Sequence, residues 1–121
     1  MSGSGLTGEQ KTVIFDLMNE CYDIANSKGW HDRTRGLPEA IALQHSELSE
    51  ALESYRTKPD RQDYIDQFLA TPKESVAVEF ADVFIRIFDT CKEFNIPLHC
   101  ALDWKIAYNK TREYRHGNKK A

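Results

Sequence analysis

Two pairs of carboxylates recur at the same spacing in separate parts of the sequence. Glu47 and Glu50 lie three residues apart, and so do Glu79 and Asp82. On a helix, residues three apart share one face and can contact one ligand. Four carboxylates gathered at one point repel one another, and Mg²⁺ relieves this repulsion because it prefers oxygen ligands. If their helices face each other, the two pairs predict a magnesium site; the alternative is that each pair is an ordinary solvated helix surface.

The second pair lies in the apolar segment "VAVEFADVFIRIF". At about 100° per residue, five charged residues fall on one stripe roughly 80° wide, and apolar residues cover most of the remaining surface. The five are Glu79, Asp82, Arg86, Asp89 and Glu93. An ordinary surface helix shows the opposite pattern, an apolar stripe on a polar cylinder. We therefore expect this helix to need more than one packing partner, at the centre of a bundle or at a subunit interface. Glu47 and Glu50 also lie beside small or apolar residues.

Four long segments have the helical spacing of apolar residues. They cover about residues 7–28, 37–55, 73–94 and 97–114, and a short helix is expected at about 64–69. Gly29 ends the first helix, and "NIP" breaks the third. No segment alternates strictly between apolar and polar residues, so no strand is expected. The predicted fold is all-α, an oligomeric antiparallel four-helix bundle in a single domain over 1–121, with a flexible N-terminus at 1–6 and a frayed tail at 115–121.

The last helix carries a row of polar side chains that suits a polyphosphate. Lys105, Asn109 and Arg112 follow each other at i, i+4 and i+7, which places two cations and an amide on one face. Arginine makes two-pronged contacts with phosphate. The alternative is a solvated cationic face favoured by the helix dipole.

Aromatic and imidazole side chains add further candidates. Trp30, in the polar link after the first helix, is expected either in the core or stacked on a nucleobase. His31 is a further candidate, for contact with the base or sugar of a nucleotide. His45 lies on the apolar side of its helix and is expected in the core.

Composition excludes several classes of function. The net charge of −3 argues against general nucleic-acid binding, which needs a basic surface. No apolar run is long enough to span a membrane, and no signal peptide is recognisable. Three cysteines without a CxxC pair indicate free thiols in a reducing compartment. We therefore expect a cytoplasmic protein without nucleic-acid or membrane partners.

Taken together, the two acidic motifs and the last predicted helix resemble those of one enzyme family. The order Glu47-x-x-Glu50 and Glu79-x-x-Asp82, with "ALQHSELSEAL" and "VEFADVFIRIFD" around them, resembles the signature of the MazG-like all-α nucleoside triphosphate pyrophosphohydrolases. "LDWKIAYNKTREYRHG" is similar to the last helix of that family, and "GW" at Gly29 and Trp30 is similar to an aromatic link in its smaller members. The resemblance covers about residues 10–117. The segment between the two acidic motifs is longer than in the compact members, which leaves the base preference open.

The resemblance implies a function for each motif. The carboxylates of Glu47, Glu50, Glu79 and Asp82 would hold Mg²⁺, with Mn²⁺ as a substitute, and either Glu47 or Glu50 would act as the catalytic base. Water would attack the α-phosphorus of a (deoxy)nucleoside triphosphate and release the monophosphate and pyrophosphate, in nucleotide-pool clean-up. Trp30, Lys105, Asn109 and Arg112 would bind the substrate.

Other interpretations remain open. Within the same superfamily, a dUTPase-like or a phosphoribosyl-ATP pyrophosphatase-like enzyme would share the acidic pattern. A non-catalytic helical interaction module is an alternative from a different class. A di-iron bundle needs two Glu-x-x-His motifs, and only Glu113-x-x-His116 is present. The large apolar surface of the third helix predicts a homodimer or homotetramer.

Overall fold

The computed structural model describes residues 5–57 and 63–112. This part of the chain is all-α, as the sequence predicts, and contains five helices and no strand. The helices are α1 (Gly8–Ser27), α2 (Leu37–Arg56), α3 (Tyr64–Ala70), α4 (Val76–Glu93) and α5 (Leu98–Lys110). A single 3₁₀ turn, Pro72–Glu74, connects α3 to α4.

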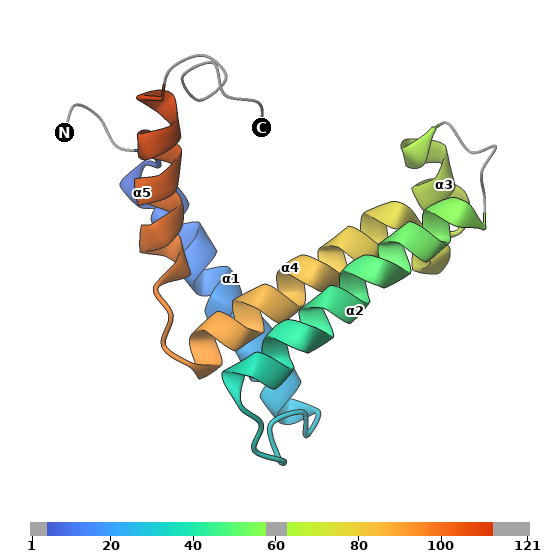
Figure 1. Cartoon of the computed structure of the whole chain (residues 1–121), viewed down its shortest axis with the longest axis horizontal. Coiled ribbons are helices and arrows are strands. Elements are labelled where there is room, and N and C mark those ends of the chain that lie inside the picture. Colours follow the sequence, from blue (N-terminus) through green and yellow to red (C-terminus); the bar gives the residue numbers. More distant parts are fainter. Residues whose placement is uncertain (1–4, 58–62, 113–121) are drawn as a thin grey trace.

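The helices form two arms that meet at an angle (Figure 1). In one arm α5 runs antiparallel to α1, and in the other α2 runs antiparallel to α4, with α3 at the far end. The second half of α1 crosses α4 where the arms join. The chain therefore has the outline of a V, and its two arms diverge from this crossing.

α4 is the central element of the fold. It packs against α1, α2, α3 and the 3₁₀ turn. The expectation that this apolar helix needs several partners is therefore confirmed. Part of its polar stripe is buried within the fold, since Asp89 is buried and forms a hydrogen bond with His31, a residue of the link that follows α1.

Local capping explains where α1 and α4 begin. Thr7 and Gln10 form a capping box, in which each side chain accepts a hydrogen bond from the other residue's backbone N–H. The buried Ser75 hydroxyl accepts a hydrogen bond from the N–H of Val78, and the buried Gln67 amide oxygen accepts one from Val76. α4 therefore starts at Val76, three residues later than the sequence pattern suggests, because Pro72 opens the 3₁₀ turn and Ser75 caps the helix.

The helix ends follow the predicted breaks with one exception. Gly29 and Asn95 both adopt positive φ, of 79° and 57°, just after α1 and α4. α5 ends at Lys110 and not near residue 114, because the N–H groups of Thr111 and Arg112 bond to carbonyls three residues back. The predicted frayed tail at 115–121 and the motif Glu113-x-x-His116 lie outside the described residues.

At the other end of the chain, part of the predicted flexible N-terminus is ordered. Residues 1–4 lie outside the described ranges, but Gly5 and Leu6 lie against α5. The N–H of Leu6 donates to the Asp103 carboxylate at 2.7 Å, and this bond holds the pKa of Asp103 below its usual value.

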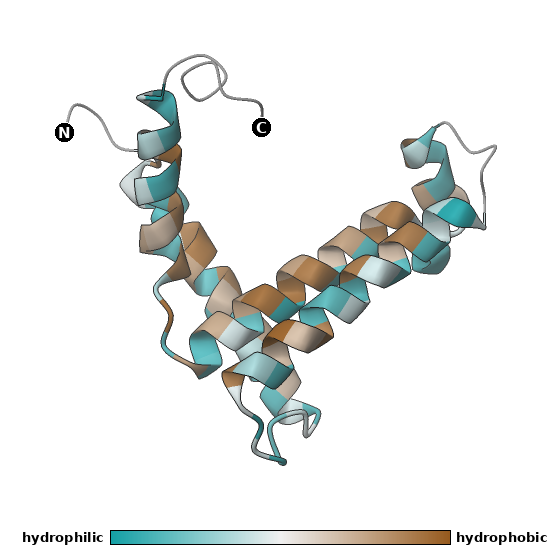
Figure 2. Cartoon of the chain, viewed as in Figure 1, coloured by the Kyte–Doolittle hydropathy of each residue, from teal (hydrophilic) through white to brown (hydrophobic). Residues whose placement is uncertain are grey.

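The buried core of the described chain is small. Its buried apolar residues are Met18, Cys91 and four alanines, namely Ala25, Ala40, Ala51 and Ala107. Many larger apolar side chains are exposed, and Figure 2 shows hydrophobic stretches of α2 and α4 along the opening of the V. His45 is exposed, so its predicted place in the core is wrong. In the part of the chain that the structure describes, no helix has the length and hydropathy needed to cross a membrane.

Candidate active site

The antiparallel contact between α2 and α4 brings the two acidic pairs within electrostatic reach of each other. The pKa of the Glu79 carboxyl is raised, first by burial and then by the charges of Glu50, Asp82 and Glu47. The pKa of Asp82 is raised by burial and by Glu47, and Arg86 opposes this shift. We call these four carboxylates, Glu47, Glu50, Glu79 and Asp82, the acid face.

An arginine that the sequence analysis left without a role is bound to the acid face. The Nε of Arg86 donates to Oε1 of Glu47 at 2.8 Å, and the two side chains are 30% and 14% exposed. This ion pair crosses from α4 to α2. The spacing in the sequence could have identified Arg86, because it lies one turn after Asp82 on the same polar stripe.

Trp30 lies next to this arginine. The Arg86 guanidinium is 5.5 Å from the centre of the indole ring, within the range of a cation–π interaction. The end of α1 fixes the position, since Gly29 turns the chain with φ of 79° and the N–H of Trp30 donates to the carbonyl of Ala25 at 3.0 Å. Trp30 is 46% exposed and is therefore available to a ligand.

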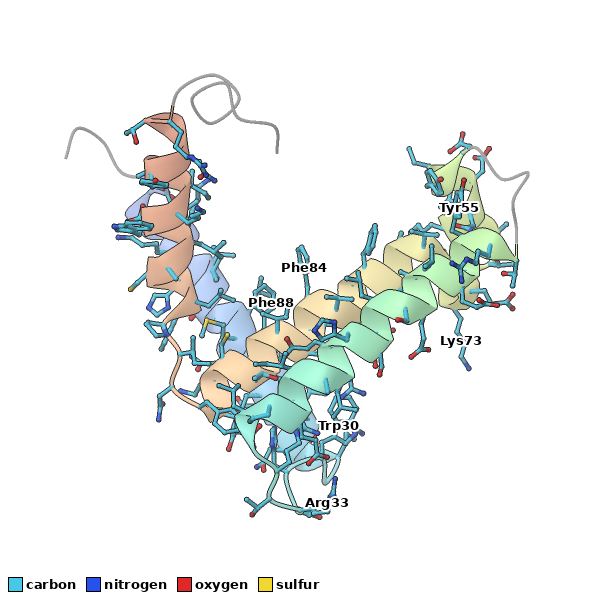
Figure 3. All side chains as sticks on the ribbon, in the orientation of Figure 1. Trp30, Arg33, Tyr55, Lys73, Phe84 and Phe88 are labelled. Atoms are coloured by element: carbon cyan, nitrogen blue, oxygen red, sulfur yellow. The ribbon has the colours of Figure 1, made fainter. Side chains whose placement is uncertain are left out.

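A cleft of about 300 Å³ opens at the other end of the acid face. Four glutamates, one lysine and two hydroxyl residues line it: Glu50, Glu53, Glu74, Glu79, Lys73 from the 3₁₀ turn, Ser54 and Thr57. In Figure 3 Lys73 projects on the same side of the α2–α4 arm as Trp30, whereas Phe84 points into the opening of the V. Sequence reasoning missed Lys73, although "TPKES" carries the proline and the serine cap that fix the turn.

The polar row of α5 lies on the other arm. α5 packs against α1, and Figure 1 shows it well away from the α2–α4 arm. Lys105 and Arg112 lie over the ring of Tyr108, at 4.9 and 5.5 Å from its centre, and Asn109 is exposed. Within one chain, the structure therefore does not bring Lys105, Asn109 and Arg112 to the acid face.

His31 is enclosed and does not face a ligand site. Its side chain is 8% exposed, with Nε2 at 2.7 Å from Asp89 and Nδ1 at 3.2 Å from Glu93. Its ring also stacks on Tyr22 at 4.8 Å. Burial raises the pKa of Asp89, and the hydrogen bond to His31 partly offsets this. His31 thus fastens the link after α1 to α4, and the predicted contact with a base or sugar is not supported.

The donor chemistry of the acid face fits a hard divalent cation, but its side chains do not form a finished cage. The raised pKa values of Glu79 and Asp82 reflect burial and mutual repulsion, which a cation would offset. Yet no group of three His, Cys, Asp or Glu side chains in the described ranges is arranged to hold a metal ion as it stands. The four carboxylates must therefore reorient before they can share one cation, and Glu47 must also leave its ion pair with Arg86.

No protein-family model, curated protein or solved structure matches the chain.

Proposed function

We propose that this protein is an Mg²⁺-dependent pyrophosphohydrolase that cleaves (deoxy)nucleoside triphosphates between the α- and β-phosphates. The observation that carries the proposal is the electrostatic coupling of Glu47, Glu50, Glu79 and Asp82 across α2 and α4. The resemblance of these motifs to the MazG-like pyrophosphohydrolases supplies the reaction. Free thiols at Cys21, Cys91 and Cys100 are compatible with the proposed cytoplasmic location.

The four carboxylates of the acid face have different roles in this proposal. Glu50, Glu79 and Asp82 would provide oxygen ligands to the cation, and Glu47 would provide a fourth once it leaves Arg86. The divalent cation, when bound, neutralises phosphate charge and favours attack by water. Of the two base candidates we favour Glu50, because it is exposed beside the cleft whereas an oxygen of Glu47 already accepts a hydrogen bond from Arg86.

The surroundings of the acid face set a direction for the substrate. Arg86 and Glu79 are seven residues apart on α4, or about 10 Å along the helix axis. Trp30 lies at the Arg86 end and offers a flat ring to the base, and Lys73 lies at the Glu79 end and offers a cation to the terminal phosphates. We therefore propose that the base lies toward Trp30 and the leaving pyrophosphate toward Lys73.

The row on α5 requires a second chain if it contacts the same substrate. Lys105, Asn109 and Arg112 belong to the arm that diverges from the acid face, so they reach substrate only when another copy presents them. The predicted homodimer or homotetramer would provide that copy, and the predicted antiparallel four-helix bundle would then form between chains.

The test is to incubate the protein with Mg²⁺ or Mn²⁺ and a panel of nucleoside and deoxynucleoside triphosphates. We expect pyrophosphate and monophosphate as products, and little orthophosphate. Glu79→Gln should abolish the release of pyrophosphate while circular dichroism remains unchanged. Glu20→Gln, the same substitution at an exposed position of α1, should retain full activity. Release of orthophosphate alone would refute the proposal.

The second candidate is a non-catalytic helical module that assembles through its apolar surface. The exposed side chains of Phe80 and Phe84, at 51% and 62%, favour assembly but do not require chemistry. Inactivity across the whole panel with both cations, in a protein that is folded and oligomeric, would favour this alternative.

A further inference from the structure

Two adjacent residues of the link that joins α1 to α2 are attached to successive turns of α4. The Arg86 guanidinium lies 5.5 Å from the centre of the Trp30 ring. About one turn further along α4, Oδ1 of Asp89 lies 2.7 Å from Nε2 of His31. After another turn, Oε2 of Glu93 lies 3.2 Å from Nδ1 of His31, although Nδ1 has no hydrogen-bond partner among the described residues. The hydrogen bond to Asp89 is therefore the closest attachment of the link to α4.

His31 is held more firmly than its neighbour Trp30. The side chains of His31 and Asp89 are 8% and 4% exposed, so their hydrogen bond is largely shielded from water. A bond from an imidazole N–H to a carboxylate is strong, and breaking it here would leave a buried charge without its partner. Tyr22 of α1 stacks on the imidazole at 4.8 Å, and the charge of Arg35 also acts on Asp89. His31 is thus fixed between α1 and α4.

The position of Trp30 depends on this attachment. Trp30 is 46% exposed, and its cation–π contact with Arg86 contributes only about 0.5–1 kcal/mol at an exposed site. The residue before it, Gly29, carries no side chain that could restrain the indole ring. The residue after it is His31, whose Cα lies about 3.8 Å away across one peptide bond. A displacement of His31 from Asp89 would therefore move the indole ring relative to Arg86.

We propose that His31 is a positioning residue, whose hydrogen bond to Asp89 holds the indole ring of Trp30 beside Arg86 and ready for a flat ligand. A ring that is already in place loses less conformational freedom when a ligand stacks on it, so binding is stronger. The identity of that ligand, a nucleobase, rests on the proposed function. The restraint on Trp30 does not, because it belongs to the folded chain without substrate.

The experiment measures the quenching of Trp30 fluorescence by acrylamide in a Trp104→Phe background, in which Trp30 is the only tryptophan. His31→Asn carries an amide that is too short to reach Asp89, so it should release the link. Because Trp30 is 46% exposed, its release should raise the quenching constant by up to about twofold. His31→Gln places an amide nitrogen near the position of Nε2 and keeps the bond to Asp89, so its quenching constant should match that of the background chain.

Thr90→Val is the matched control, because it removes a different hydrogen bond at the next position of α4. The Thr90 hydroxyl accepts a hydrogen bond from the Gln44 amide of α2 at 3.0 Å. Thr90→Val should lower the free energy of unfolding and leave the quenching of Trp30 unchanged. The comparison separates a loss of stability from a loss of position.

Steady-state kinetics test whether His31 acts through Trp30. His31→Asn should raise the KM for a triphosphate about tenfold with a smaller change in kcat, as Trp30→Leu should. The variant that combines both substitutions should have the KM of Trp30→Leu alone, because the two changes remove the same contact with the substrate. Unchanged quenching in His31→Asn, or additive effects on KM in the combined variant, would overturn the inference.

A second variant tests the hydrogen bond if His31→Asn loses helicity. The chain with both His31→Leu and Asp89→Leu has an apolar pair and leaves neither of the two partners as an unpaired buried charge. It should also raise the quenching of Trp30, and unchanged quenching would refute the role of the hydrogen bond. Raised quenching in a chain that hydrolyses no triphosphate would support the restraint on Trp30 and refute only the proposed function.

Discussion

Replacing Arg86 of α4 with methionine removes the positive charge beside the acid face and keeps a side chain with a similar apolar stem. The ion pair with Glu47 has one side chain 14% exposed and the other 30% exposed. The free energy of unfolding that is lost when this ion pair is broken therefore lies between two limits. These are about 0–1 kcal/mol for a pair on the surface and about 3–5 kcal/mol for a buried pair. We expect Arg86→Met to lower the free energy of unfolding by about 2 kcal/mol in the absence of metal.

Thermal unfolding with a chelator present, at fixed protein concentration, measures this loss. With an unfolding entropy of about 2.1 cal/mol/K per residue, about 2 kcal/mol corresponds to a decrease in Tm of about 8 °C. Glu47→Gln is the matched variant, since it breaks the same ion pair but also removes one of the repelling carboxylates. We expect Glu47→Gln to lower the free energy of unfolding by a smaller amount, below about 1 kcal/mol.

Mg²⁺ should then separate the two variants. In Arg86→Met all four carboxylates of the acid face remain and lack their cation, so Mg²⁺ should raise its Tm by more than that of the wild type. In Glu47→Gln one ligand is missing, and Mg²⁺ should have a smaller effect. Equal losses in the two variants, together with no response to Mg²⁺ in either, would refute the idea of four acids sharing one cation.

Three further predictions concern single residues. The pKa of Glu79 is raised in the folded chain, so the folded state keeps this proton to higher pH than the unfolded state, and the ionised carboxylate destabilises the fold more as pH rises. Without metal, the Tm of Glu79→Gln should therefore rise relative to that of the wild type as pH increases from about 4 to about 7. A Tm difference that shrinks with pH would contradict the raised pKa of Glu79. Trp30→Leu should raise the KM for a triphosphate about tenfold with a smaller change in kcat, because a stacked base is lost; steady-state kinetics that show a change in kcat alone would exclude stacking. Gly29→Ala forces a side chain into a backbone with φ of 79° and should lower the free energy of unfolding by about 1 kcal/mol in a urea titration, whereas a neutral result would contradict the left-handed turn.

The sequence predicted those parts of the fold that local physics determines. Apolar periodicity located the helices, and Gly29 and the Asn95–Pro97 break marked the ends of α1 and α4. The start of α4 was misplaced because its periodicity extends back through the 3₁₀ turn, and only the cap at Ser75 reveals the boundary.

The arrangement of the arms could not be predicted in the same way. Periodicity identifies which side of a helix is apolar, but it does not identify which neighbour covers that side. The position of His45 shows this limit, because its apolar side of α2 lines an open groove and not the core. The row on α5 shows it again, since its spacing defines a face but not the arm on which Lys105 lies.

For the candidate site, spacing identified the four carboxylates but not the cations beside them. Arg86 pairs with Glu47 across two helices, and Lys73 reaches the cleft only because the 3₁₀ turn bends the chain. Contacts of this kind depend on tertiary geometry. Trp30 was identified with two alternatives, and its 46% exposure beside Arg86 favours the ligand-facing one.

The most direct measurement of the central claim is phosphorus NMR of the products formed in ¹⁸O-labelled water with Mg²⁺ and a deoxynucleoside triphosphate. Our account predicts that the heavy oxygen appears in the nucleoside monophosphate and that the pyrophosphate is unlabelled, because water attacks the α-phosphorus. It also predicts that Glu79→Gln forms neither product. Label in pyrophosphate or orthophosphate, or products that persist in Glu79→Gln, would contradict the assignment of this reaction to the acid face.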